Sequence, residues 1–311
     1  MTTDEAMSDT RKGWRRAAGL LGVVLATSIL QPIVLVAVPL LILLGLEGRG
    51  TGAIVVAAIF GFFVVLAGPR DGLWFVERAW ALIAGGVFAA LATYVPHWRL
   101  TSRSMAAVGS AIVISGVFLT IRRGAWAAID WQVTDHLRSG FATWLDVIAV
   151  LRDGEAVPPT LVTAIYQTVE AQAQLFPALM AIETMAALGL AWWVFGRVAP
   201  TEEKDVGTLR GFRFNDHLVW LMIAGLAMVA LLPEDGGSRL GANVAVFMGS
   251  LYALRGIGVV VFVNGGLTFI GITMFALGIL FAAPVVIGFT VLLGIADTWL
   301  DLRARAGAQA A

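Results

Sequence analysis

Five charged side chains lie within long apolar stretches of this sequence, and they are the residues best placed to carry chemistry. They are Glu77, Arg78, Glu183, Arg255 and Asp297. An ionised group in hydrocarbon costs about 2.5–3.5 kcal/mol on insertion scales, so such residues mark ion pairs, proton relays or contacts with a polar substrate. We therefore predict these five residues as candidate intramembrane polar sites.

Other kinds of chemistry lack the residues that they need. The chain contains no cysteine, and its three histidines, His97, His136 and His217, lie far apart in the sequence. Metal binding or covalent catalysis requires clustered ligands, or a nucleophile beside a base. The sequence has no phosphate-binding glycine loop, and its zero net charge disfavours nucleic-acid binding. We predict that the protein is not an enzyme and that it has no catalytic, cofactor or metal site.

The elements that position these charges must be membrane helices. Hydrophobic residues make up 59% of the chain and charged residues 14%, whereas about 25% of an ordinary soluble domain is charged. The apolar segments are continuous and do not alternate with polar residues, which disfavours membrane β-strands. The composition predicts an all-α fold, a polytopic transmembrane helix bundle.

Several apolar runs approach the roughly 20 residues that a helix needs to cross a bilayer. They are Gly50–Ala67, Leu73–Val95, Ser104–Ile121, Leu175–Val198, Leu218–Leu232, Ala242–Val263, Gly266–Ala283 and Val285–Leu300. A further stretch, Ala17–Leu46, is either one long helix or two short ones separated at Gln31-Pro32, because proline removes a backbone donor. The bundle is therefore expected to have about 8–10 membrane segments.

The distribution of arginine and lysine predicts the orientation of these segments. If Ala17–Leu46 enters and leaves the membrane as two pieces, 13 of these residues lie on the cytoplasmic side and 6 outside. If it crosses once, the division is 10 to 9. The positive-inside rule favours the first arrangement. It predicts a multipass protein of the bacterial cytoplasmic (inner) membrane with both termini in the cytoplasm.

Residues 126–174 differ from the membrane segments around them. Trp126–Leu151 mixes tryptophan and aliphatic residues with acidic ones, the pattern of an amphipathic helix at the membrane interface. In Leu161–Gln174, the residues Gln167, Glu170 and Gln174 form one polar stripe on a helix. This insertion is either a brace that lies on the membrane surface or a lid over a cavity.

The same patterns divide the chain into five parts. Residues 1–16 form a cytoplasmic tail, and residues 17–198 form a first bundle that includes the interfacial helices 126–174. A charged cytoplasmic linker, 199–216, leads to a second bundle, 217–303, and a tail, 304–311.

Depth along the helices predicts which charges meet. Arg255 lies 8 residues before Val263 and Asp297 lies 3 residues before Leu300, which is about 12 Å and 5 Å from the same membrane face. A long arginine side chain covers this difference, so the two are expected to pair. Such a pair either fixes the helix register or contacts a substrate or ion. Alternatively, Arg255 forms no pair and extends to the cytoplasmic headgroups.

The other three charges fall nearer the outer face. Glu77 and Arg78 are near a helix end, where an anchor at the interface is the simplest role. Glu183 lies in the apolar stretch Met180–Leu190 and either ties helices together or lines a polar path.

Small residues recur every four positions in Ala18-Gly22-Ala26, Ala107-Ala111-Ser115 and Ala245-Gly249-Ala253. Such ridges let helix backbones approach closely. Internal packing is the simpler interpretation, and docking of a partner membrane subunit is the alternative.

The C-terminal third resembles the YybS-like family of predicted bacterial membrane proteins. The similarity covers about residues 209–303 and is carried by Gly211–Trp220, by Asn243 with Leu251–Val259, and by Leu293–Arg303. The resemblance implies an uncharged polar residue where Arg255 stands, so it assigns that arginine no role. It also implies a distant similarity to substrate-binding components of energy-coupling-factor transporters.

We therefore expect a membrane component that binds a small molecule or takes part in its transport. The alternative is a membrane scaffold or assembly factor that transports nothing. The expected partners are the lipid bilayer and an unidentified small molecule. A cavity lined by Glu183 would favour the first function, and a closed bundle with every charge paired would favour the second.

Overall fold

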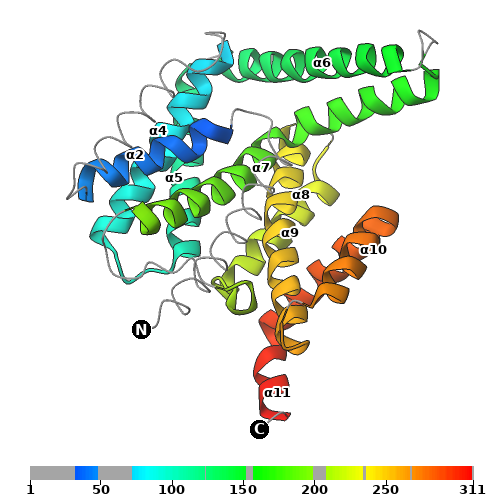
Figure 1. Ribbon diagram of the computed structural model, residues 1–311. Coiled ribbons are helices and arrows are strands. Elements are labelled where there is room, and N and C mark those ends of the chain that lie inside the picture. The colour runs from blue at the N-terminus through cyan, green and yellow to red at the C-terminus, as the bar shows by residue number, and fades with distance from the viewer. Residues whose placement is uncertain are drawn as a thin grey trace. The chain divides into compact units, whose positions relative to one another are not determined.

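The computed structural model describes residues 32–47, 72–122, 124–151, 157–198, 208–233, 236–266 and 268–309, and every regular element within these ranges is a helix (Figure 1). This confirms the predicted all-α fold. The chain divides into two compact units, Met1–Val206 and Gly207–Ala311, which we describe separately.

The first unit is built around three helices that pack against one another. They are α2 (Pro32–Glu47), α4 (Gly72–Tyr94) and α7 (Pro159–Val198). Their apolar side chains form a core that includes Val34, Trp80 and Phe176. The α2 helix begins at Pro32, but residues 17–31 lie outside the described residues, as does the predicted span Gly50–Ala67. Whether Ala17–Leu46 forms two pieces thus stays a prediction.

Two further helices complete the described part of this unit. The α5 helix (Leu100–Ile121) begins four residues before the predicted start at Ser104 and buries Ala107 and Ala111. That small-residue ridge therefore packs internally. The α6 helix (Ala125–Leu151) confirms the helix predicted over Trp126–Leu151.

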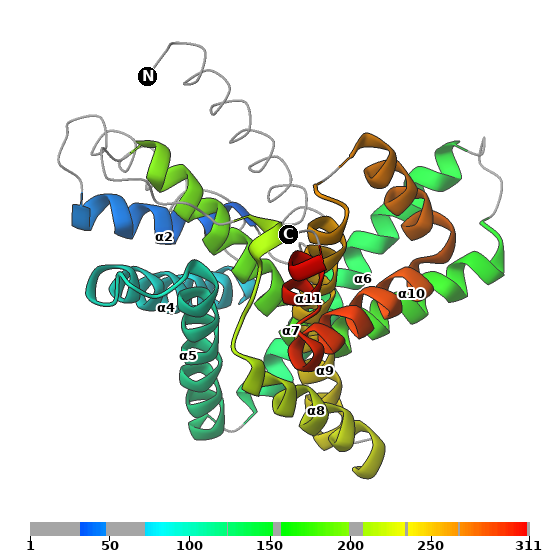
Figure 2. The ribbon, with the colours of Figure 1, turned by 90° about the horizontal axis from the view of Figure 1, so that it is seen from below.

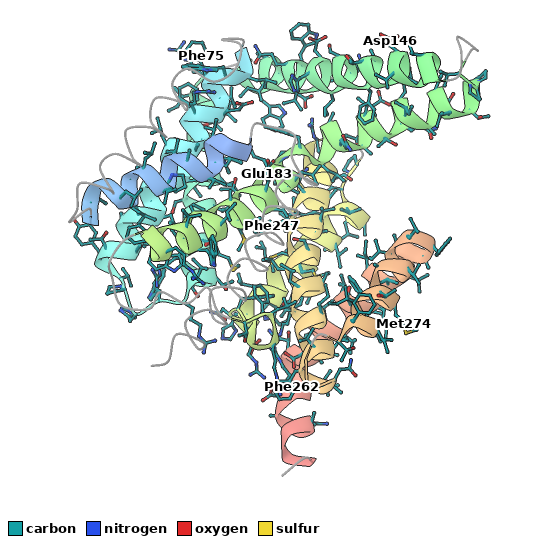
Figure 3. The ribbon with its side chains drawn as sticks, viewed as in Figure 1. Phe75, Asp146, Glu183, Phe247, Phe262 and Met274 are labelled. Carbon is teal, nitrogen blue, oxygen red and sulfur yellow. The ribbon has the colours of Figure 1, made fainter. Side chains whose placement is uncertain are left out.

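The α6 helix lies beside the first half of α7 in a helical hairpin (Figures 1 and 3). Val133 and Leu137 of α6 share an apolar cluster with Val169 and Ala173 of α7. The polar stripe of α7 is exposed on another face, where Glu170 lies 3.9 Å from Arg138. The prediction that Leu161–Gln174 and the following span are separate helices is wrong, because α7 continues through Pro177. A proline removes one helical hydrogen bond, and buried side chains on both sides, Phe176 and Ala178 among them, hold this helix together.

We predict that single cysteines on α6 will differ in their reaction with a water-soluble thiol reagent. Asp135 is exposed and should label rapidly as Asp135→Cys, whereas Val133 is buried against α7 and Val133→Cys should be protected at least tenfold. The chain contains no cysteine, so the background is zero. Equal labelling rates at the two positions would show that α6 does not pack on α7 by this face.

The second unit is organised around α9 (Gly236–Val263), which contacts α8 (Val219–Leu231) and α10 (Phe269–Leu300). Two short 3-10 turns precede α8, at Leu209–Gly211 and Asp216–Leu218, and the helix α11 (Leu302–Gln309) follows α10. A Cβ atom on Gly241 would lie 2.7 Å from the carbonyl oxygen of Gly225, so α8 and α9 meet at these glycines. Of the predicted ridge Ala245-Gly249-Ala253, Ala245 lies at this contact, because its backbone nitrogen is 3.1 Å from a Cβ on Gly225, whereas nothing lies within 4 Å of a Cβ on Gly249.

The predicted spans Gly266–Ala283 and Val285–Leu300 form a single bent element, α10 (Figure 2). Ala282 has non-helical backbone angles, φ −144° and ψ 41°, and Pro284 follows it. Proline removes a hydrogen bond and displaces the preceding turn, which accounts for the bend. Met274 and other apolar side chains before the bend are exposed (Figure 3), as expected of a helix that faces lipid.

Within the described residues, five helices are long and apolar enough to cross a membrane. They are Gly72–Tyr94, Leu100–Ile121, Pro159–Arg197, Gly236–Val263 and Phe269–Leu300. Two apolar helices, Val34–Leu46 and Asp216–Leu231, are shorter. The α6 helix is not among the five, and its location at the interface stays a prediction.

Candidate functional site

A glycine contact brings α9 and α10 close enough for their charged residues to meet. A Cβ atom on Gly256 would overlap the carbonyl oxygen of Thr290, and a Cβ on Gly294 would overlap that of Tyr252. Only glycine leaves room for backbones at this separation. The contact places Arg255 on α9 opposite Asp297 on α10.

The structure contains the ion pair that the sequence predicts. Arg255 donates from Nε to Oδ2 of Asp297 at 2.9 Å and from Nη2 to the Asp297 carbonyl oxygen at 3.3 Å. The two residues are 2% and 1% exposed. Arg255 also donates from Nη1 to Oδ1 of Asp216 at 2.6 Å, a contact that the sequence analysis did not predict.

A second arginine reaches the same carboxylate from α11. Asp301 ends α10 in the left-handed conformation, with φ 42° and ψ 55°, and this turn directs Arg303 back towards Asp297. Arg303 donates from Nη2 to Oδ2 of Asp297 at 2.6 Å and from Nε to Oδ1 at 3.3 Å. Asp297 therefore pairs with two buried arginines.

The segment 208–218 packs over this ionic network. Its backbone carbonyls at Arg210 and Phe212 accept hydrogen bonds from Nη1 of Arg303 at 3.2 and 3.0 Å. Its Phe214 ring lies 5.6 Å from the Arg255 guanidinium. On the surface, Arg213 donates to Asp301 at 2.6 Å. The segment is thus attached to α9, α10 and α11 by charged groups.

The network is balanced in charge. Arg255 and Arg303 face Asp297 and Asp216, two cations with two carboxylates. Buried charges are retained when each is paired and hydrogen-bonded, and removal of one partner is costly. This arrangement suits the fixing of helix register better than the binding of a charged ligand.

The remaining predicted charges lie in the first unit. Glu183 is 0% exposed and lies on α7 (Figure 3). The neighbouring Thr184 accepts a hydrogen bond from Nε1 of Trp80 at 2.9 Å. Trp80 is three residues after Glu77, about 5 Å along α4. The hydrogen bond between Trp80 and Thr184 therefore places Glu77 and Glu183 at similar positions along the axes of α4 and α7.

Glu77 and Arg78 are buried near the start of α4. They are 7% and 8% exposed, and Nη1 of Arg78 lies 3.5 Å from Oε2 of Glu77. The Arg78 guanidinium also lies 4.2 Å from the centre of the Trp74 ring. Two helices of the first unit therefore bury polar residues, Glu77 and Arg78 on α4 and Glu183 and Thr184 on α7.

Comparison with known families identifies the kind of protein. A family of predicted membrane proteins, DUF2232, has a model that matches residues 17–298. The chain belongs to this family. The family description and the five long apolar helices agree that DUF2232 proteins are membrane proteins. No curated protein and no solved structure matches the chain, and among the described residues no group of three or more His, Asp and Glu could hold a metal.

Proposed function

We propose that this protein is a membrane component that binds a small molecule or takes part in its transport, and that Glu183 contributes to the binding path. The observation that carries the proposal is the complete burial of the Glu183 side chain in α7. Ionisable groups inside membrane segments are costly, and proteins keep them mainly where they act on ions, protons or substrates.

The surroundings of Glu183 support this proposal. Two helices that are long enough to span a membrane, α4 and α7, bury two carboxylates, a guanidinium and a threonine hydroxyl, and the hydrogen bond from Trp80 to Thr184 joins these helices. The resemblance of residues 209–303 to the YybS-like family, and through it to substrate-binding transporter components, adds support. The predicted cytoplasmic segments are too short for a nucleotide-binding domain, so energised transport would need an ATPase on another chain.

A membrane scaffold without transport is the second candidate. The balanced ionic network of the second unit favours it, because those charges serve each other. The two candidate functions therefore concern different units. Binding is assigned to Glu183 in the first unit, and structural support to the ionic network around Asp297 in the second unit.

The experiment that tests the proposal is the identification of molecules that co-purify with the protein. The protein would be purified from its native membrane in a mild detergent, and bound small molecules would be extracted and identified by mass spectrometry. We expect one compound at about one per chain, enriched over an unrelated multipass protein purified in parallel. Enrichment of no compound would overturn the proposal and favour the scaffold.

A further inference from the structure

A buried arginine near the start of α5 forms no ion pair with any carboxylate of the described residues. Arg103 is 7% exposed. Its Nε donates to the carbonyl oxygen of Trp98 at 2.8 Å and its Nη2 to that of Pro96 at 3.3 Å. Its guanidinium lies 4.7 Å from the centre of the Trp192 ring on α7.

This arginine differs from the buried arginines of the second unit. Arg255 and Arg303 each pair with Asp297, whereas no carboxylate among the described side chains forms an ion pair with Arg103. The stretches nearest to Arg103 and Trp192 in sequence are free of acidic residues, since no Asp or Glu lies between Glu77 and Asp130 or between Glu183 and Glu202. The carbonyl and ring contacts orient the guanidinium but do not neutralise its charge.

Two more arginines increase the positive charge at this end of the first unit. Arg99 precedes α5 and is exposed, and it lies one helical turn before Arg103. Arg197 is in the last turn of α7, five residues beyond Trp192, or about 7–8 Å along the helix axis. Among the described residues, the end where α4 stops, α5 starts and α7 stops therefore has three arginine side chains.

Uncharged donor groups also lie at this end. The Ser104 side chain is 2% exposed, and its hydroxyl has no hydrogen-bond partner among the described residues. No side chain caps the N-terminus of α5 at Arg99, and the free N–H groups of a helix N-terminus favour an anion. Guanidinium, hydroxyl and backbone N–H groups are together the donors that bind a phosphate group.

We propose that this end of the first unit binds the phosphate of one anionic phospholipid. Arg103 is the main contact, and Arg99 and Arg197 add charge. The helices α4, α5 and α7 are long enough to span a membrane, and each has one terminus at this end of the unit. A helix that spans a membrane has its termini at the depth where headgroups lie. Exposed aromatic side chains, Tyr94 at 84% and Trp98 at 39%, are typical of that depth. Basic groups at such a surface are attracted to anionic lipids.

The test is lipid binding by the whole purified protein in a neutral detergent. Native mass spectrometry and thermal unfolding would be recorded with phosphatidylglycerol, with phosphatidylcholine and with inorganic phosphate. We expect one phosphatidylglycerol per chain and a raised unfolding temperature, with no effect of the other two. Equal binding of phosphatidylcholine would overturn the proposal. Stabilisation by inorganic phosphate without lipid preference would overturn the assignment to a lipid.

Substitutions test whether these arginines bind the lipid. Arg103→Gln should weaken phosphatidylglycerol binding about tenfold, and Arg99→Gln with Arg197→Gln about fivefold. Arg122→Gln is the matched control, because Arg122 is exposed at the opposite end of α5, and it should leave affinity unchanged. If Arg103→Gln does not fold, the Arg99→Gln/Arg197→Gln protein decides the question. Wild-type affinity in that protein, or in a folded Arg103→Gln, would contradict the proposal.

Discussion

Replacing Gly294 by alanine is expected to destabilise the second unit by about 3 kcal/mol, at the upper end of the range for an overpacked site. The added Cβ would overlap the carbonyl oxygen of Tyr252 and lie 3.1 Å from the backbone nitrogen of Gly256. Backbone atoms cannot move aside as a flexible side chain can. The two helices must separate, and this separation weakens the Arg255–Asp297 contact as well.

Reversible unfolding of the purified protein, followed by its helical circular dichroism, measures this effect. Gly288→Ala is the control, since it lies on the same helix and a Cβ there would have nothing within 4 Å. It should be neutral or stabilising by about 0.5–1 kcal/mol, because alanine is favoured over glycine in helices. Equal stability of Gly294→Ala and Gly288→Ala would show that α9 and α10 do not meet at these glycines.

Replacing Asp297 by asparagine is expected to cost about 3–5 kcal/mol, because a buried charge loses its partner. Two arginines lose their carboxylate at once, and they are 2% and 4% exposed. Asp301→Asn makes the same chemical change four residues later. There the ion pair with Arg213 is exposed, 56% and 40% for the two side chains, and its loss should cost less than about 1 kcal/mol. The same unfolding measurement separates the two cases, and similar losses would contradict the ionic network.

The double variant Arg255→Gln/Asp297→Asn extends this result. If only these two residues were paired, neutralising both would restore most of the stability that either single change loses. Since Arg303 also binds Asp297, we expect partial recovery, and further recovery when Arg303→Gln is added. Strictly additive losses would show that the residues do not interact.

The sequence allowed the Arg255–Asp297 pair to be predicted, but not the rest of the network. The pair follows from depth, because each residue's distance from a helix end can be counted. Arg303 follows Asp297 by six residues, which in a continuous helix places it about 240° away. The left-handed turn at Asp301 removes this separation. Glycine is the usual residue in that conformation, so an aspartate gives no signal for the turn.

Helix boundaries were harder to predict where proline or charge lies near them. Pro177 lies inside a continuous helix, because buried side chains on both sides keep the chain helical. The boundary predicted at Pro284 coincides with the kink of α10, where Ala282 has non-helical backbone angles. The predicted apolar run begins at Ser104, so it does not include Arg103, which lies in the first turn of α5. A count of apolar residues cannot show that the first turn of α5 buries an arginine against Trp192.

The proposed function requires that the buried carboxylate Glu183 of the first unit binds a ligand, whereas the charges of the second unit support its structure. The most direct measurement is the amount of co-purifying compound per folded chain in wild type, Glu183→Gln and Glu170→Gln. Glu170 lies on the same helix, and its side chain is 70% exposed. We predict at least a tenfold loss of the compound in Glu183→Gln and no loss in Glu170→Gln. Wild-type amounts in a folded Glu183→Gln protein would contradict the account.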